Sequence, residues 1–229
     1  MDKSLSESVV CYIAQELKNG TLRAGDKIPS EKKLQEQLGI GRLSLREGLA
    51  RCSALGIITS SQGRNSVVSL QVNANELSQA FLPLFSQQKQ QFTEDLQSVR
   101  SLIECEAVAL AALKRTDSDI SELERIIDEA SKQDSHKLIV EKDLRFHTKI
   151  AEIADNIFLR IILEVLHAQV MWFVDESLQY PHQHQTALQW HADILESISE
   201  ADSEKARATM FLHLRSCTYA YQHRHDKAN

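Results

Sequence analysis

Glycine is absent from this chain between Phe92 and Arg224, and the whole sequence of 229 residues contains only seven glycines and three prolines. Such scarcity argues against turn-rich all-β chains, collagen-like repeats and low-complexity chains, and it favours long helices. The composition is otherwise that of an ordinary globular protein, with 42% hydrophobic and 25% charged residues. The sequence therefore predicts a mostly α-helical fold of one large domain or two modest ones.

The sequence shows no sign of membrane insertion or export. It has no run of 18 apolar residues, and its first residues, Met1 to Ser4, do not lead into the hydrophobic region of a signal peptide. We therefore expect a cytoplasmic protein that does not span a membrane. The cysteines are scattered without a CxxC pair, as is typical of reduced packing thiols. They are Cys11, Cys52, Cys105 and Cys217.

Charge is distributed unevenly along the chain. Residues 1–70 contain ten Lys and Arg against seven Asp and Glu, whereas residues 71–229 contain 16 against 25. A basic end on an acidic body indicates two domains with different partners. The imbalance at the basic end is small, so charge alone does not establish DNA binding.

The first seventy residues contain start and stop signals for three helices followed by a β-hairpin. Ser30 is suited to cap the second helix, and the Gly39–Gly41 turn separates it from the third. This order is that of a winged helix-turn-helix. The expected helices cover residues 5–18, 30–38 and 42–55, and the expected strands cover 57–60 and 66–70, with a turn at 62–65.

Basic and hydroxyl side chains occupy the places where such a fold meets DNA. Arg42, Ser44 and Arg46 lie in the first turn of the third helix, which would enter the major groove. Arginine grips a guanine edge or a phosphate with two parallel hydrogen bonds. We expect further DNA contacts from Lys32 in the preceding helix and from the wing tip, at Gly63 and Arg64.

This region resembles the GntR family of transcription regulators. The resemblance rests on GTLRAGDKIPSEKKL at residues 20–34 and LGIGRLSLREGL at residues 38–49. It implies that Lys32, Arg42, Ser44, Arg46 and Gly63 contact operator DNA. One departure is Gly41, which stands where Ser or Thr usually caps the recognition helix in this family.

The remaining chain is predicted to form a linker and a helical bundle. Residues 71–91 include a glutamine-rich run and are expected to form a short helix and a connection. Residues 92–225 are expected to form an antiparallel all-helical domain. Caps are expected at Thr116–Asp117, Asp134–Ser135 and Asp202–Ser203. The six helices should lie near residues 92–114, 118–132, 135–154, 157–178, 184–200 and 203–224.

Ionisable residues interrupt the apolar stripes of three of these helices. Asp143 and His147 are one turn apart, and His191 and His213 lie on inward stripes of the last two helices. A carboxylate with three imidazoles suits Zn²⁺, Ni²⁺ or Mn²⁺. Because buried histidines are often satisfied core residues, periodicity alone leaves both a metal site and a packed core open.

The same residues carry a second resemblance, to the FCD ligand-binding domain of the FadR subfamily of GntR regulators. It rests on DLRFHTKIA at residues 143–151, on HADIL at 191–195 and on His213. The resemblance implies that Asp143, His147, His191 and His213 bind a divalent metal, with zinc first. It also implies an effector role for Arg100, which we weigh against a surface salt bridge between Arg100 and Glu104.

Together these features predict a ligand-responsive transcription regulator rather than an enzyme. We expect a homodimer that binds operator DNA, acts as a repressor and responds to a small organic acid, such as a sugar acid or a hydroxy- or dicarboxylate. One alternative is a metal-dependent hydrolase fused to a DNA-tethering domain, although no H-E-x-x-H motif is present. Another is an architectural DNA-binding protein with a structural metal.

Overall fold

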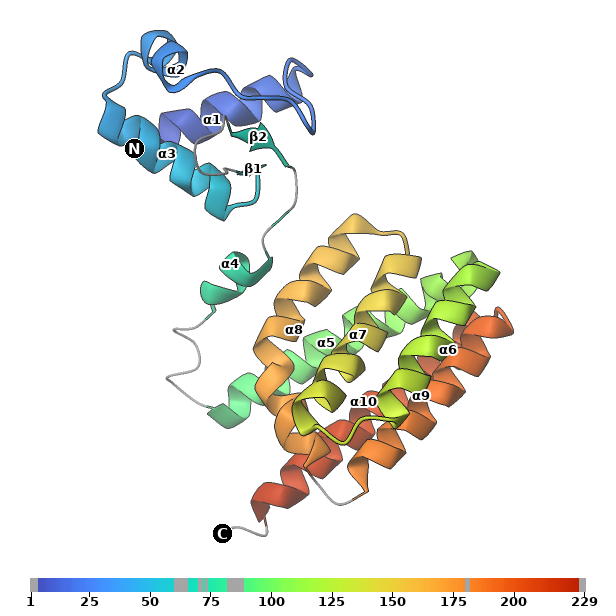
Figure 1. The fold of residues 1–229 in the computed structure, drawn as a ribbon. Helices are drawn as coiled ribbons and strands as arrows, with labels where there is room; N and C mark the ends of the chain where they lie inside the picture. Colours follow the sequence, from blue (N-terminus) through green and yellow to red (C-terminus); the bar gives the residue numbers. More distant parts are fainter. Residues whose placement is uncertain are drawn as a thin grey trace. The chain divides into compact units, whose positions relative to one another are not determined.

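The structure is a computed structural model that describes residues 4–59, 66–69, 72, 74–81, 89–179 and 182–226. The chain divides into two compact units, Met1–Leu77 and Ser78–Asn229. Among the residues that the structure describes, the first unit contains three helices and a small sheet, and the second contains six long helices. Figure 1 shows both units.

The N-terminal unit has the order expected of a winged helix-turn-helix. The strands pair in an antiparallel manner, with Ile58 opposite Val68, and are shorter than predicted. The predicted turn at residues 62–65 lies outside the described residues. The elements are α1 (Leu5–Lys18), α2 (Glu31–Leu38), α3 (Arg42–Ala54), β1 (Ile58–Thr59) and β2 (Val67–Val68). The predicted fold class of this unit is thus confirmed.

A glycine allows α1 and α3 to approach closely. A Cβ atom at Gly48 would lie 2.5 Å from Cβ of Val9 and 2.7 Å from the backbone oxygen of Ser6. Val9 is fully buried and shares the core of this unit with Leu45. The support of α3 against α1 therefore depends on the missing side chain at position 48.

The second unit is a bundle in which short connections reverse the chain at each step, so that successive helices run antiparallel (Figure 1). The short helix α4 (Ala74–Gln79) precedes it. The bundle helices are α5 (Lys89–Lys114), α6 (Asp117–Ser131), α7 (His136–Ile153), α8 (Ile157–Leu178), α9 (Gln183–Ser199) and α10 (Ser203–Asp226). Two of the three predicted caps form: Thr116 makes a capping box with Asp119, and Asp202 accepts from the backbone of Lys205. Ser135 lies at the N-cap of α7 but its side chain accepts no capping hydrogen bond.

The buried face of α5 agrees with the predicted stripe at Leu96 and Ala107 but differs from it at Val99. The apolar pattern predicts that Val99 faces inward, but this residue is 44% exposed. Arg100 and Glu104 are instead buried, with 1% exposure each. The two opposite charges compensate each other inside the bundle, which allows Arg100 and Glu104 to be buried.

Helix α8 is unusually apolar. It has no run of 18 apolar residues, yet its length and composition meet the requirement for crossing a membrane, with a mean hydropathy of 1.7. Core helices of soluble bundles meet the same requirement. In this chain α8 packs against α7, α10 and α5.

Candidate metal centre and nucleic-acid interface

The polar residues predicted on inward helix stripes are buried. Asp143 and His147 lie one turn apart on α7, His191 lies on α9 and His213 lies on α10. Their exposed fractions range from 1% to 7%. Apolar neighbours on the same stripes, such as Ile150 and Ile198, form the core that fixes the register of these helices.

These four side chains converge on one point. Each offers one ligand atom, and the four atoms lie within 4.8 Å of one another. Nε2 of His147 is 3.2 Å from Nε2 of His213, and Nε2 of His191 is 3.4 Å from Oδ1 of Asp143. Ligand bonds of about 2.0–2.2 Å place neighbouring ligand atoms about 3.4 Å apart around a tetrahedral cation. The arrangement therefore has the dimensions of a metal centre.

The protonation states favoured in this cluster also suit a cation. Burial, together with the neighbouring imidazoles, lowers the pKa of His191 and of His213 well below the usual value. Both rings are therefore neutral at physiological pH and keep a nitrogen lone pair. Burial raises the pKa of Asp143, so a nearby positive charge would stabilise its ionised form. Apart from its approach to Asp143, Nε2 of His191 makes no hydrogen bond within the described part of the chain, so it can act as a ligand.

A second buried group adjoins the cluster. Nε of Arg100 donates to Oε1 of Glu104 at 2.5 Å, and Oε2 of Glu104 is in direct contact with Nδ1 of His147. Nε2 of His167, on α8, lies 3.6 Å from Oε1 of Glu104. Burial by itself would raise the pKa of Glu104, but the charge of Arg100 and the contact with His147 outweigh it and hold the pKa well below its usual range.

The sequence analysis did not predict that His167 and Glu104 lie beside the candidate metal centre. His167 follows Leu163 and precedes Val170 and Val174 at helical spacing, so the inward stripe of α8 carried a usable signal for it. Glu104 carried none, because an Arg and a Glu four residues apart are typical of an exposed helix face. The salt bridge between Arg100 and Glu104, given above as the alternative to an effector role, does form, but it is buried and does not lie at the surface.

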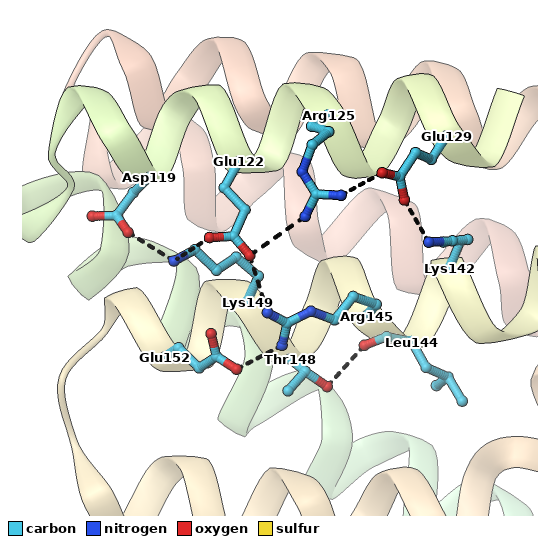
Figure 2. A network of polar contacts seen from close by, with 10 residues as sticks. All are labelled: Asp119, Glu122, Arg125, Glu129, Lys142, Leu144, Arg145, Thr148, Lys149 and Glu152. Atoms are coloured by element: carbon cyan, nitrogen blue, oxygen red, sulfur yellow. Dashed lines mark hydrogen bonds and ion pairs between the residues drawn. The ribbon is translucent and has the colours of Figure 1, made fainter.

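The outer face of α7 is tied to α6 by a network of ion pairs (Figure 2). Lys149 lies 2.8 Å from Asp119 and 3.3 Å from Glu122. Arg145 lies 3.1 Å from Glu122 and 2.6 Å from Glu152. The hydrogen bond from Lys149 lowers the pKa of Asp119 to about 2. These pairs occupy the polar side of α7, so its opposite side turns Asp143 and His147 into the bundle.

The predicted DNA-binding residues that the structure describes lie at the surface of the N-terminal unit. Lys32, Arg42 and Arg46 are exposed, and Ser44 is half-buried. Gly63 and Arg64 lie outside the described residues. Glu31, the first residue of α2, accepts from Nε of Arg46 at 3.3 Å and lies 3.9 Å from Nε of Arg42.

The start of α3 lacks a side-chain cap. Gly41 occupies the N-cap position in an extended conformation, with φ of −71°, and makes no capping hydrogen bond. A Cβ atom at this position would meet nothing within 4 Å. The backbone therefore admits the Ser or Thr that the family usually places there.

Comparisons with known proteins agree with this architecture. Residues 5–68 match the model of bacterial regulatory proteins of the gntR family, and residues 95–216, more than half of the chain, match the FCD domain. The chain is 29% identical to the Glc operon transcriptional activator of Escherichia coli K12, covering 93% of this chain and 87% of that protein. It is 28% identical to the HTH-type transcriptional repressor NanR of Salmonella newport, covering 93% and 84%.

A solved structure shares the fold. The Streptococcus agalactiae GntR structure superimposes with a TM-score of 0.68 at 22% identity, covering 93% of this chain and 98% of that one. The matched families and relatives are transcription regulators and not enzymes, so the hydrolase alternative is set aside. This chain belongs to the GntR family of DNA-binding bacterial transcription regulators, with a winged helix-turn-helix followed by an FCD domain.

Proposed function

We propose that the chain is a ligand-responsive repressor that binds operator DNA as a homodimer. Its FCD domain would hold a divalent metal and a small organic acid, such as a sugar acid or a hydroxy- or dicarboxylate. The observation that carries this proposal is the convergence of four buried ligand atoms beside a buried arginine. The relatives include one that is named a repressor and one that is named an activator, so the promoter measurement below decides the direction of regulation.

The donor set fits a borderline metal ion. Asp143, His147, His191 and His213 would hold it, and three imidazoles with one carboxylate favour zinc first, with nickel and manganese as alternatives. A bound cation would supply a Lewis-acidic positive charge to which a carboxylate can bind. The buried neutral histidines are already in the protonation state that a metal requires.

The charges around the cluster favour an acid as the effector. Ionised Asp143 and Glu104 together with Arg100 leave one net negative charge in the interior. A divalent cation would turn this into one net positive charge, which a single carboxylate neutralises. Nη1 of Arg100 is buried without a hydrogen-bond partner and is therefore available to the same carboxylate.

The DNA-binding part of the proposal rests on placement. Arg42, Ser44 and Arg46 lie at the start of α3, where a recognition helix meets base edges, and Lys32 is placed to hold the phosphate backbone. We extend the interface to Gly63 and Arg64 at the wing. A two-fold dimer would match a pseudo-palindromic operator.

Metal analysis of chelator-free protein and a thermal-shift screen of carboxylates test the sensing half. An acid at about a hundred times its Kd should stabilise the metal-loaded chain by about 2.7 kcal/mol. Arg100→Lys should weaken this response, whereas Arg207→Lys, which alters an exposed pair with Glu106, should not. If no carboxylate changes the operator affinity of the metal-loaded protein, the proposed response to an acid is contradicted. If the activity of the regulated promoter falls when the protein is removed, repression is contradicted.

A further inference from the structure

Glu104 is the meeting point of three bundle helices. It lies on α5 with 1% exposure, and its carboxylate contacts Arg100 on the same helix, His147 on α7 and His167 on α8. It is not one of the four residues that form the candidate metal centre. An apolar residue would fill such a position without burying a charge, so its carboxylate calls for a specific role.

The two oxygens of Glu104 have different partners. Oε1 receives the Nε–H of Arg100 at 2.5 Å, which fixes the carboxylate on α5. Oε2 faces Nδ1 of His147. An imidazole with a carboxylate at one nitrogen carries its proton there and keeps its lone pair on the other nitrogen. The free nitrogen of His147 is Nε2, which lies 3.2 Å from Nε2 of His213 at the convergence point.

We propose that Glu104 is a positioning residue of the metal centre: its carboxylate holds the proton of His147 on Nδ1 and so presents Nε2 to a divalent cation. The inference rests on the metal site of the proposed function. Carboxylates that orient a ligating histidine in this way also make the imidazole a stronger ligand, and their loss typically weakens metal binding by about 10- to 100-fold.

A tautomer measurement tests this role before any metal is added. Nitrogen-15 NMR of the imidazole rings, assigned with a His147→Gln chain, should show His147 protonated on Nδ1 in the metal-free wild type. Glu104→Ala should shift the proton away from Nδ1, and Glu104→Gln, which keeps an acceptor oxygen, should retain it. Glu106→Ala is the matched control, because Glu106 lies on the same helix but pairs with Arg207 at the surface.

Zn²⁺ titration of the same full-length chains gives the second readout. Glu104→Ala should weaken binding by about 10- to 100-fold, Glu104→Gln should recover most of the loss, and Glu106→Ala should match the wild type. Should Glu104→Ala fail to fold, the double variant Arg100→Met/Glu104→Met removes both buried charges and should show the same loss.

The outcomes separate the two proposals. A wild type that binds Zn²⁺ while a folded Glu104→Ala chain, or the double variant, binds it equally well overturns this inference alone. An unchanged His147 tautomer in those variants also overturns it. A wild type that takes up no divalent cation overturns the metal site of the proposed function, and this inference with it.

Discussion

Each of the two units of this chain places an arginine beside a glutamate, in opposite surroundings. Arg46 and Glu31 meet at 3.3 Å on the N-terminal unit, where 56% and 42% of their side chains are exposed. Arg100 and Glu104 meet at 2.5 Å inside the bundle, where 1% of each is exposed. The residue types are the same, but one pair is exposed to solvent and the other is buried.

The difference decides what each pair can do. An exposed pair is screened by water and typically contributes about 0–1 kcal/mol, so a DNA phosphate can take over its arginine at little cost. A buried pair has no solvent to replace a lost partner, and removing one member costs about 3–5 kcal/mol. The partner of an arginine that is proposed to contact DNA can thus be exchanged easily, whereas the buried Arg100 keeps its partner until another anion can reach it.

The largest expected effect is on stability, when Glu104 and Glu31 are each replaced by alanine. Glu104→Ala should lower the unfolding free energy of the bundle by about 3–5 kcal/mol, because the Arg100 charge stays buried without its partner. Glu31→Ala should change stability by less than about 1 kcal/mol. Hydrogen exchange in the full-length chain reports each unit separately, and equal effects of the two changes would remove the distinction between the pairs.

Acid should destabilise the bundle selectively. All nine histidines follow residue 135, and burial holds the pKa of His191 and His213 well below its unfolded value. The unfolded chain therefore binds more protons as pH falls, so the stability contributed by these two rings is complete above about pH 6.5 and is lost below it. Asp143, whose pKa is raised, offsets part of this loss.

For metal-free protein the free energy of unfolding should fall as the pH drops from 7 to about 5, because His191 and His213 resist protonation in the folded chain. Urea unfolding at a series of pH values measures it. His213→Gln, which cannot titrate, should make the slope smaller. A bundle whose stability is level across this range would show that the two rings are not held neutral.

The exposed pair should respond at the level of DNA binding. Arg46→Ala should weaken operator affinity by about 1–3 kcal/mol and relax sequence preference, as expected when a base contact is lost. Glu31→Gln should strengthen binding by less than about 1 kcal/mol, because it removes the negative charge that pairs with Arg46. Selection from random-sequence duplexes followed by binding titrations tests both, and tighter binding by Arg46→Ala would exclude its role.

The smallest effect concerns the start of α3. Gly41→Ser has room for its side chain and should add the missing cap, which stabilises the N-terminal unit by a few tenths of a kcal/mol. Thermal unfolding measures the change. Gly39→Ser is the contrasting variant and should destabilise, because Gly39 has a φ of +64°.

Local signals in the sequence were enough to place most helices. Capping residues such as Thr116 and turn residues such as Gly39 act over a few positions, so they can be read without knowing the fold. The inward stripe of α7 could be read in the same way, because Asp143 and His147 interrupt an otherwise apolar row that includes Ile150.

Features that depend on contact between helices far apart in the sequence could not be predicted from local sequence patterns. The apolar pattern of α5 predicts that Val99 is buried, because it carries no information about His147 on α7 and His167 on α8, which contact the buried Glu104. The role of Gly48 depends in the same way on Val9, nearly forty positions earlier, and not on its own helix.

Helix α5 connects the buried Glu104 to the end of the bundle where the helix begins. It begins at Lys89, ten residues after the end of α4 in the sequence, and Glu104 lies fifteen residues further along. At 1.5 Å per residue this separation is about 22 Å of rigid rod, so a tilt of about 5° pivoting at Glu104 would swing the first turn of α5 by about 2 Å. A small displacement of the Glu104 carboxylate would in this way move the first turn of α5, which is the end of the helix nearest in sequence to the DNA-binding unit.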